Sequence, residues 1–328
     1  MTFPAPFDTW FPDAAFDGSY GHTLASLRHV PPVPPFAGFE NGWRRWRAEA
    51  ALVDAAPTVL SSTRNDGRDV AIVEHAGADG IRLRSWVVSP EAGRTARVGV
   101  VHGHGYGGRD AVDLARVPAD AAAIFPVARG LGALNAGVGA PEPRPEHVVA
   151  GIARPETTVL GLCARDLWLA ADTLTHLAGD VPLYYVGESF GGGIGAMALP
   201  WDDRYVGATL IVPSFGQYDE RLAVPCLGSG EDVRHYVAAH PEAREVLRWF
   251  DASTSLAFAD VPVRIEAALW DQYVPPQGQF AVASAARMLE LEVLPAGHAE
   301  YPGWEQVTAR AAAGGLAHLD RCLAQRVG

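Results

Sequence analysis

The sequence predicts an α/β protein with a mostly parallel central sheet and helices on both faces of that sheet. From about residue 97 onward, short apolar segments alternate with longer segments of helical periodicity. This alternation is typical of parallel strands joined by crossover helices. The stretch RVGVVHGHG, residues 97–105, is apolar without a polar face, which indicates a strand buried on both sides.

Length and composition favour one domain with additions. A chain of 328 residues with 48% hydrophobic residues can bury one large core. We expect residues 1–55 to form an N-terminal extension that wraps the core. Residues 56–328 then form a single domain, with a cap-like insertion at about 215–258 that either covers the site or makes an oligomer contact.

The charge balance argues against nucleic-acid and membrane partners. The chain has 38 acidic and 26 basic residues and a formal net charge of −12, which repels phosphate backbones and anionic lipids. The N-terminus lacks the basic and continuous apolar regions of a signal peptide, and no stretch approaches about 18 uninterrupted apolar residues. We therefore expect a soluble, cytoplasmic protein.

The cysteines give no sign of a disulfide framework or a metal centre. Cys163, Cys226 and Cys322 are an odd number and show no C-x-x-C spacing. We expect three buried free thiols and a protein without a metal or other cofactor.

The pattern of elements follows from periodicity. In the extension, a helix is expected over 42–55, and the proline-rich stretch 29–39 is expected to wrap the domain, a partner-binding polyproline segment being the alternative. Strands are expected at 70–77, 81–90, 97–105, 124–130, 182–189, 206–214, 263–271 and 291–298. Helices are expected at 156–178, 192–199, 278–289 and 304–324, with helical pieces at 231–250.

One serine stands where a strand turns sharply into a helix. YYVGESFGGGIG, residues 184–195, contains the pattern G-x-S-x-G centred on Ser189. Small residues such as Gly187, Gly191 and Gly192 let the backbone pack closely at such a turn, and the serine hydroxyl then points away from the sheet. This is the nucleophile elbow, although the pattern by itself occurs by chance too often to decide a function.

Two further residues complete a catalytic arrangement. Ser189, Asp271 and His298 each close a predicted strand, and the carboxyl ends of parallel strands meet at one edge of the sheet. Their order along the chain is that of the α/β-hydrolases. His298 would be the base that activates the serine, and Asp271 would orient its ring. Asp251 and Asp260 are the alternative acids.

A glycine-rich loop offers donors for a developing oxyanion. HGHGYGG, residues 102–108, follows a predicted strand directly, where a loop N–H acts together with the N–H of the residue after the nucleophile, here Phe190. We expect Gly105 to be the loop donor, with Tyr106 as the alternate. A phosphate-binding loop is disfavoured because the G-K-[ST] ending is absent. His102 and His104 lack a third metal ligand of convincing spacing.

These motifs together resemble the acetyl xylan esterase and cephalosporin C deacetylase family of carbohydrate esterases, within the α/β-hydrolases. The similarity covers roughly residues 35–325. The stretches that carry it are HGHGYGGRD, ARGLG, GESFGGGIG, LWDQYVPP and GHAEY. The resemblance implies an α/β-hydrolase fold, the triad and oxyanion donors named above, removal of acetyl groups from sugars or similar alcohols, and a closed homo-oligomer.

Three positions depart from the family pattern. Leu131 replaces the glutamine of the Arg-Gly-Gln turn, Phe190 replaces the glutamine after the nucleophile, and Ala299 stands where a glutamate follows the histidine. An oxyanion contact from residue 190 uses the backbone, so the triad chemistry tolerates the change, whereas sugar or cephalosporin specificity does not follow from the resemblance.

We therefore expect a serine carboxylic ester hydrolase that deacetylates a small or oligosaccharide alcohol. Tyr106, Phe215 and Trp270 are expected to crowd the acyl pocket and to favour acetyl over longer chains. The alternatives are a peptidase or a carbon–carbon bond hydrolase of the same fold, and a non-catalytic binding protein. We also expect a homo-oligomer.

Overall fold

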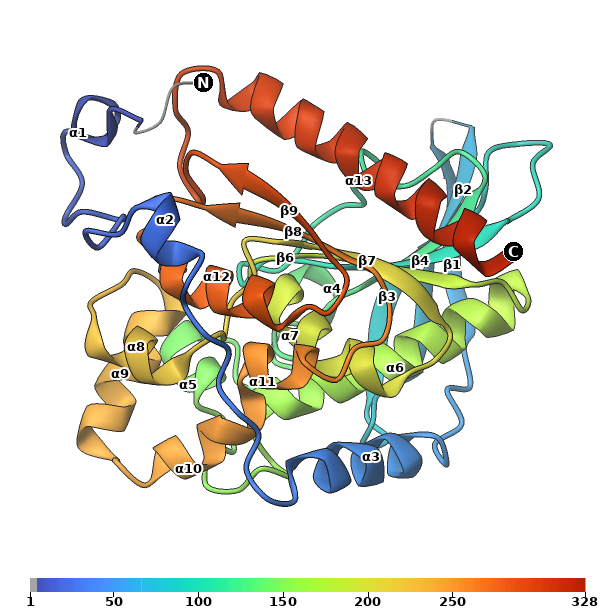
Figure 1. The fold of residues 1–328 in the computed structure, drawn as a ribbon. Helices are drawn as coiled ribbons and strands as arrows, with labels where there is room; N and C mark the ends of the chain where they lie inside the picture. The colour runs from blue at the N-terminus through green and yellow to red at the C-terminus, as the bar shows by residue number, and fades with distance from the viewer. Residues whose placement is uncertain (1–4, 66, 328) are drawn as a thin grey trace.

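A nine-stranded sheet forms the centre of the computed structural model, which describes residues 5–65 and 67–327 (Figure 1). Residues 1–4 of the predicted extension lie outside the described residues, as do residues 66 and 328 of the predicted domain. The strand order is β1-β2-β3-β5-β4-β6-β7-β8-β9. The strands are β1 (Thr58–Asn65), β2 (Arg68–Ala76), β3 (Arg82–Val88), β4 (Val98–Gly103), β5 (Ala121–Pro126), β6 (Leu183–Glu188), β7 (Tyr205–Ile211), β8 (Val263–Ala268) and β9 (Leu289–Leu294).

The sheet is mostly parallel, as the sequence predicts. Every pair from β5 through β4 to β9 is parallel. The pairs β1–β2, β2–β3 and β3–β5 are antiparallel. Successive side chains of a strand point to opposite faces. In β6, Leu183 and Tyr185 join the core on one face, while Tyr184 and Val186 join the core on the other.

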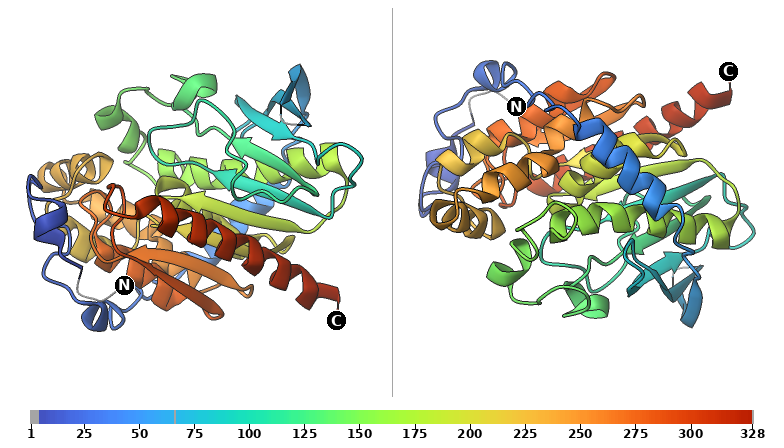
Figure 2. Two further views of the ribbon diagram at one scale, coloured as in Figure 1. Left: turned by 90° about the horizontal axis from the view of Figure 1, so that it is seen from above. Right: turned by 90° about the horizontal axis from the view of Figure 1, so that it is seen from below.

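Helices cover both faces, which confirms the α/β expectation. The views in Figure 2 show α13 lying along one face, whereas α3 and α6 lie on the other. The helices of the core are α4 (Gly132–Asn135), α5 (Arg144–Val148), α6 (Val159–Ala178), α7 (Phe190–Ala198), α12 (Pro276–Ala285) and α13 (Trp304–Val327), with a 3-10 turn at Leu199–Trp201.

The N-terminal segment lies against the core and the insertion. It contains α1 (Phe7–Trp10), α2 (Leu24–Leu27) and α3 (Phe39–Ala50). The Trp43 indole of α3 donates a hydrogen bond to the Trp249 carbonyl at 3.1 Å. Between α2 and α3, the Val33 N–H donates to Ser253 Oγ at 3.1 Å, so the proline-rich stretch packs on the insertion.

The insertion between β7 and β8 is helical, as predicted. It contains α8 (Tyr218–Ala223), α9 (Ser229–Ala239), α10 (Ala243–Leu247), a 3-10 turn at Arg248–Phe250 and α11 (Ala252–Leu256). These helices gather beside the end of the sheet where β6 leads into α7 (Figure 1).

Several elements differ from the sequence expectation. The helix expected over 42–55 spans Phe39–Ala50. Strand β1 has no counterpart in the prediction, because all of its residues are exposed and no apolar face marks it in the sequence. The helix expected over 278–289 ends at Ala285, since Ala286 is extended and Leu289 already begins β9.

The three cysteines are free and buried, which confirms the expectation for Cys163, Cys226 and Cys322. Within the described part of the chain, no helix combines the length and the apolar character needed to span a membrane.

A buried ion cluster ties the loop after β5 to α6. The side chain of Arg129 is fully buried and makes hydrogen bonds to both carboxylate oxygens of Asp166 at 2.8 Å. It also pairs with Asp79 in the β2–β3 turn at 2.8 and 3.0 Å. A buried guanidinium is stable only while its charge is compensated. These contacts therefore set the position of the loop that begins at residue 127.

We predict that Asp166→Asn lowers the free energy of unfolding by about 3 kcal/mol, because it removes charge from a partner of a buried cation. Urea unfolding measures the change. The matched control is Asp69→Asn, which breaks an exposed pair with Arg64 and should cost at most about 1 kcal/mol. Equal losses in the two variants would contradict the prediction.

Candidate active site

Ser189 lies at the apex of the turn between β6 and α7. Its backbone angles are φ 52° and ψ −110°, a region that non-glycine residues rarely adopt. The Ser189 N–H donates to the Ile211 carbonyl at 2.8 Å, and the Ser189 carbonyl accepts from the N–H groups of Gly193 and Ser214, each at 3.0 Å. These bonds hold the strained backbone in place.

Two glycines allow this turn to touch the end of β4. A Cβ on Gly187 would lie 2.5 Å from the Gly191 carbonyl oxygen, and a Cβ on Gly191 would lie 2.7 Å from the carbonyl carbon of Gly103. The Gly191 N–H also donates to the His104 carbonyl at 2.8 Å. The elbow is thereby fixed against the glycine-rich loop.

The three residues singled out in the sequence meet in a hydrogen-bonded chain. His298 Nε2 lies 2.8 Å from Ser189 Oγ, and His298 Nδ1 lies 2.8 Å from Asp271 Oδ2. Because a carboxylate only accepts, Nδ1 carries the proton given to Asp271, and Nε2 is left to accept from the Ser189 hydroxyl. This tautomer is the one that can deprotonate the serine.

Asp271 is fully buried and its carboxylate is well supplied with donors. Oδ1 accepts from the N–H groups of Tyr273 at 2.8 Å and Val274 at 3.0 Å. Oδ2 accepts from Gln279 Nε2 at 3.0 Å as well as from His298. Sequence reasoning missed Gln279, because a glutamine in a helix carries no motif of its own.

The pKa of His298 is raised above its ordinary value of 6.5. Burial alone lowers it, but the charge and hydrogen bond of Asp271 outweigh burial, and the Glu188 carboxylate adds to the rise. Arg221 opposes this with a smaller effect. The imidazolium that forms during proton transfer is therefore stabilised.

Neither alternative acid reaches the histidine. Asp251 is the N-cap of α11, where it accepts from the N–H groups of Ser253 and Thr254. Asp260 is exposed and forms an ion pair with Arg287.

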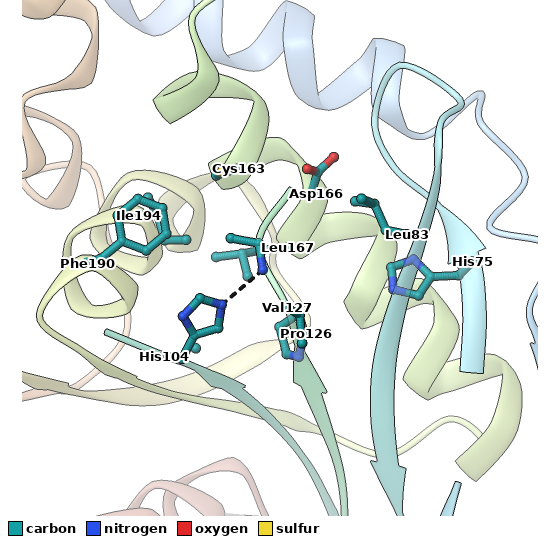
Figure 3. A pocket seen from close by; sticks show the side chains of 12 residues that line it. His75, Leu83, His104, Pro126, Val127, Cys163, Asp166, Leu167, Phe190 and Ile194 are labelled. Atoms are coloured by element: carbon teal, nitrogen blue, oxygen red, sulfur yellow. Dashed lines mark hydrogen bonds between the residues drawn. The ribbon is translucent and has the colours of Figure 1, made fainter. Parts of the chain in front are cut away.

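The glycine-rich loop is held by His104. Burial lowers the pKa of His104 to about 4, so its ring is neutral. Its Nδ1–H donates to the Gly105 carbonyl at 2.6 Å, and its Nε2 accepts from the Ala128 N–H at 2.9 Å. Figure 3 shows this ring and its bond to the backbone beside Val127, on the buried side of the loop.

The candidate oxyanion donors face the same space as Ser189. A Cβ on Gly105 would lie 4.0 Å from the Ser189 Cβ, so this glycine borders the nucleophile. Among the described residues, the backbone N–H groups of Gly105, Tyr106 and Phe190 donate no hydrogen bond to another backbone or side-chain group. All three line the pocket above Ser189.

Tyr106 is fixed by a second buried histidine, which sequence reasoning also missed. His147 Nε2–H donates to the Arg129 carbonyl at 2.9 Å, so Nδ1 accepts from the Tyr106 hydroxyl at 2.7 Å. The Tyr106 ring packs edge-on against Phe190 at a centroid distance of 5.4 Å. The loop is thus anchored at His104 and at Tyr106.

A pocket of about 490 Å³ opens over Ser189 and His298. Its size suits a ligand larger than an acetyl group alone. Phe215 and Tyr106 line it. The residues that line it are Gly105, Tyr106, Gly107, Gly108, Arg144, Glu188, Ser189, Phe190, Ser214, Phe215, Arg221, Leu227, Gly228, Ser229, Tyr273, Val274 and His298.

Trp270 lies outside this pocket, contrary to the expectation from sequence. Its ring stacks on the ring of Phe11 in the N-terminal segment, with 3.9 Å between the ring centroids. It is buried in a cluster with Tyr301 and Val307. The side chain of Trp270 points away from the pocket because the N-terminal segment provides an aromatic partner on the other side of the Asp271 loop.

Both histidines of the HGHG stretch bond to neighbouring protein groups, although His102 Nε2 has no partner among the described residues. His102 Nδ1 accepts from Arg109 at 3.0 Å, and burial lowers the pKa of His102 to about 3. Over residues 5–65 and 67–327, no group of three or more His, Cys, Asp or Glu side chains is placed to hold a metal ion.

Comparison with solved structures identifies the fold. An acetyl xylan esterase from Paenibacillus sp. R4 matches with a TM-score of 0.78 at 20% identity, over 89% of this chain and 99% of that chain. The chain has the α/β-hydrolase fold. Acetyl xylan esterase 1 from Thermoanaerobacterium sp. JW/SL YS485 matches with a TM-score of 0.71 at 17% identity, over 92% and 99% of the two chains.

The alpha/beta hydrolase GrgF from Penicillium sp. sh18 matches with a TM-score of 0.55 at 16% identity, over 78% of this chain and 99% of that chain. No protein-family model matches the chain, and no curated protein matches it by sequence. At these identities the likeness establishes the α/β-hydrolase fold, and an activity has to be argued from the site.

We predict that the pKa of His298, followed by NMR of the imidazole resonances, lies above 6.5 in the wild type and falls in Asp271→Asn. The substitution removes the charge that raises the pKa and leaves the burial that lowers it. Asp260→Asn, which removes a distant carboxylate, is the control and should leave the midpoint unchanged. A wild-type midpoint at or below 6.5 would contradict the assignment.

Proposed function

We propose that this protein is a serine carboxylic ester hydrolase that removes acetyl groups from sugars or related small alcohols. The observation that carries the proposal is the chain of 2.8 Å contacts from Ser189 through His298 to buried Asp271, at the floor of a pocket. A serine hydroxyl becomes a nucleophile at neutral pH only when a base lies within hydrogen-bond reach.

In the first half-reaction, Ser189 Oγ attacks the ester carbonyl while His298 Nε2 takes the hydroxyl proton. The oxyanion that forms is stabilised by the Phe190 N–H and by the N–H of Gly105, with Tyr106 as the alternate donor. Asp271 stays ionised and stabilises the imidazolium. His298 then returns the proton to the leaving alcohol oxygen, which leaves an acyl-serine.

In the second half-reaction, water attacks the acyl-serine with His298 again as the base, and the acid and the free serine are released. No cofactor takes part in these steps. Protonated His298 cannot accept the serine proton, so kcat/KM falls as the pH drops through the raised pKa of this residue.

The acetyl preference is supported by the likeness to two acetyl xylan esterases and by the aromatic lining of the pocket. Phe190 packs edge-on against both Tyr106 and Phe215, with centroid distances of 5.4 and 5.8 Å. Three rings that brace one another beside the nucleophile resist displacement by a long acyl chain. This reasoning favours an esterase for small acyl groups over a lipase-like enzyme.

Three finer points belong to the same proposal. The substrate is a small-molecule or oligosaccharide ester, with no nucleic-acid or membrane partner. The protein acts in the cytoplasm and assembles as a homo-oligomer, for which the N-terminal segment and the insertion supply surface beyond the sheet. The alternatives are a peptidase, a carbon–carbon bond hydrolase and a non-catalytic binding protein, and the experiments below test the first and the last of these.

We predict that Ser189→Ala lowers kcat/KM for p-nitrophenyl acetate by about a thousandfold or more and abolishes labelling by a fluorophosphonate probe, because the attacking oxygen is lost. Ser61→Ala, which changes an exposed serine of β1, is the control and should behave as the wild type. A wild type that the probe leaves unlabelled would instead favour the non-catalytic alternative.

We predict that kcat/KM decreases from p-nitrophenyl acetate to the butyrate and the octanoate. An open apolar groove would gain about 0.8 kcal/mol for each buried methylene, whereas overpacking a closed pocket costs about 1–3 kcal/mol. The three esters are compared under one condition. An increase toward octanoate would overturn the acetyl preference, and cleavage of peptide substrates instead of esters would favour the peptidase.

A further inference from the structure

Arg221 is a largely buried arginine whose guanidinium has no ion-pair partner among the described residues. It lies in α8 of the insertion and only 5% of its surface is exposed. Over residues 5–65 and 67–327, its guanidinium makes no hydrogen bond and no ion pair. Its side chain packs over the ring of Phe215, with 5.7 Å between the guanidinium carbon and the ring centroid. That contact stabilises the cation but satisfies none of its five N–H donors.

The other fully buried arginines of this chain have polar partners, whereas half-buried Arg109, outside the pocket, leaves Nε and Nη1 unpaired within the described residues. Arg129 pairs with Asp79 and Asp166. Arg264 pairs with three glutamates on β8 and β9. Arg165 donates to the backbone carbonyls of α6 and of the loop before it. The guanidinium of Arg221 borders the pocket and has no hydrogen-bonding protein partner there in the part of the chain that the structure describes, so its N–H donors remain free to bind a ligand that enters the pocket.

The position of Arg221 shows where that ligand lies. Arg221 lines the same pocket as Ser189 and His298. Its charge also acts on the catalytic histidine, whose pKa it lowers against the larger effect of Asp271. An anionic group bound to Arg221 is therefore part of the molecule whose ester bond lies at Ser189.

The charges around the pocket favour a single negative charge on that group. Arg144, the other arginine of the lining, already pairs with Asp232 at 2.7 Å. Glu188 also lines the pocket, and its carboxylate opposes a second negative charge. One unpaired guanidinium matches the planar geometry of a carboxylate, whereas a doubly charged phosphate would need more positive charge than the lining provides.

We propose that the substrate carries a carboxylate and that Arg221 binds it, so that the enzyme selects esters of acidic molecules. This inference rests on the proposed function. Because the group removed is acetyl, the carboxylate belongs to the alcohol part, and the substrate class is the O-acetyl ester of a hydroxy acid or of an acidic sugar.

The catalytic test compares 4-acetoxybenzoate with its neutral methyl ester in the wild type, Arg221→Gln and Arg221→Lys. Each enzyme is assayed on the alkaline plateau of its own pH profile, so that His298 is neutral throughout. The ratio of kcat/KM for the anionic ester to that for the neutral ester is compared between enzymes, so that the intrinsic reactivity of the two substrates cancels.

We expect this ratio to fall about tenfold to a hundredfold in Arg221→Gln, as for the loss of a charge-assisted hydrogen bond, and to recover in part in Arg221→Lys. The matched control is Arg244→Gln, which removes the same charge from an exposed ion pair with Asp219 in the insertion and should keep the wild-type ratio. An unchanged ratio in Arg221→Gln overturns the proposal.

A second pair, p-nitrophenyl hemisuccinate and its methyl ester, places the carboxylate on the acyl part. If the Arg221-dependent preference appears in this pair only, the assignment to the alcohol part is overturned.

A binding measurement separates this inference from the proposed function and does not depend on a folded Arg221 variant. Titration calorimetry of the wild type should show benzoate binding at least tenfold more tightly than neutral benzamide. If neither acetoxy ester is hydrolysed but benzoate is preferred, the esterase proposal fails and the carboxylate site stands. If esters are hydrolysed but benzoate and benzamide bind equally, the carboxylate site fails and the esterase proposal stands.

Discussion

The buried carboxylate of Asp271 is the charge around which the site is organised. An isolated carboxylate in the protein interior is strongly unfavourable, so every donor that reaches it stabilises the fold. Tyr273 and Val274 supply backbone N–H groups from the loop after β8, Gln279 donates from α12, and His298 donates from the loop after β9. Satisfying one charge therefore fixes three elements relative to one another and directs His298 Nε2 toward the elbow.

The two additions to the central fold serve this arrangement differently. The N-terminal segment contributes no member of the triad, but its Gly18 carbonyl accepts from the Asp271 N–H at 2.9 Å and its Phe11 ring covers Trp270. It keeps water away from the back of the acid. The insertion lies on the other side and brings Arg221 into the pocket. In the proposed mechanism, the reacting side chains therefore lie at the ends of the sheet strands, and the proposed carboxylate-binding residue lies on the segment inserted between two of them.

Much of the arrangement is predictable because its signals are local. Each triad residue ends a strand, and parallel strands place their carboxyl ends at one edge of the sheet, so a one-dimensional pattern implies proximity in space. Ser189, Asp271 and His298 are recognisable for this reason. The buried strands are equally predictable from the sequence, since apolar residues must fill both faces of a covered sheet. Strand β1 escapes prediction because it is paired through its backbone alone and buries neither face.

The sequence by itself determined the α/β-hydrolase fold class, the turn at Ser189 and the identity of its two partners, because these depend on the order and period of residues along the chain. The tertiary structure alone decided which surroundings those residues meet. Trp270 faces the N-terminal segment, Gln279 donates to Asp271, and Arg221 borders the pocket without an ion-pair partner in the described part of the chain. Each of these facts depends on contacts between segments far apart in the sequence, where no local pattern records which side chains come together.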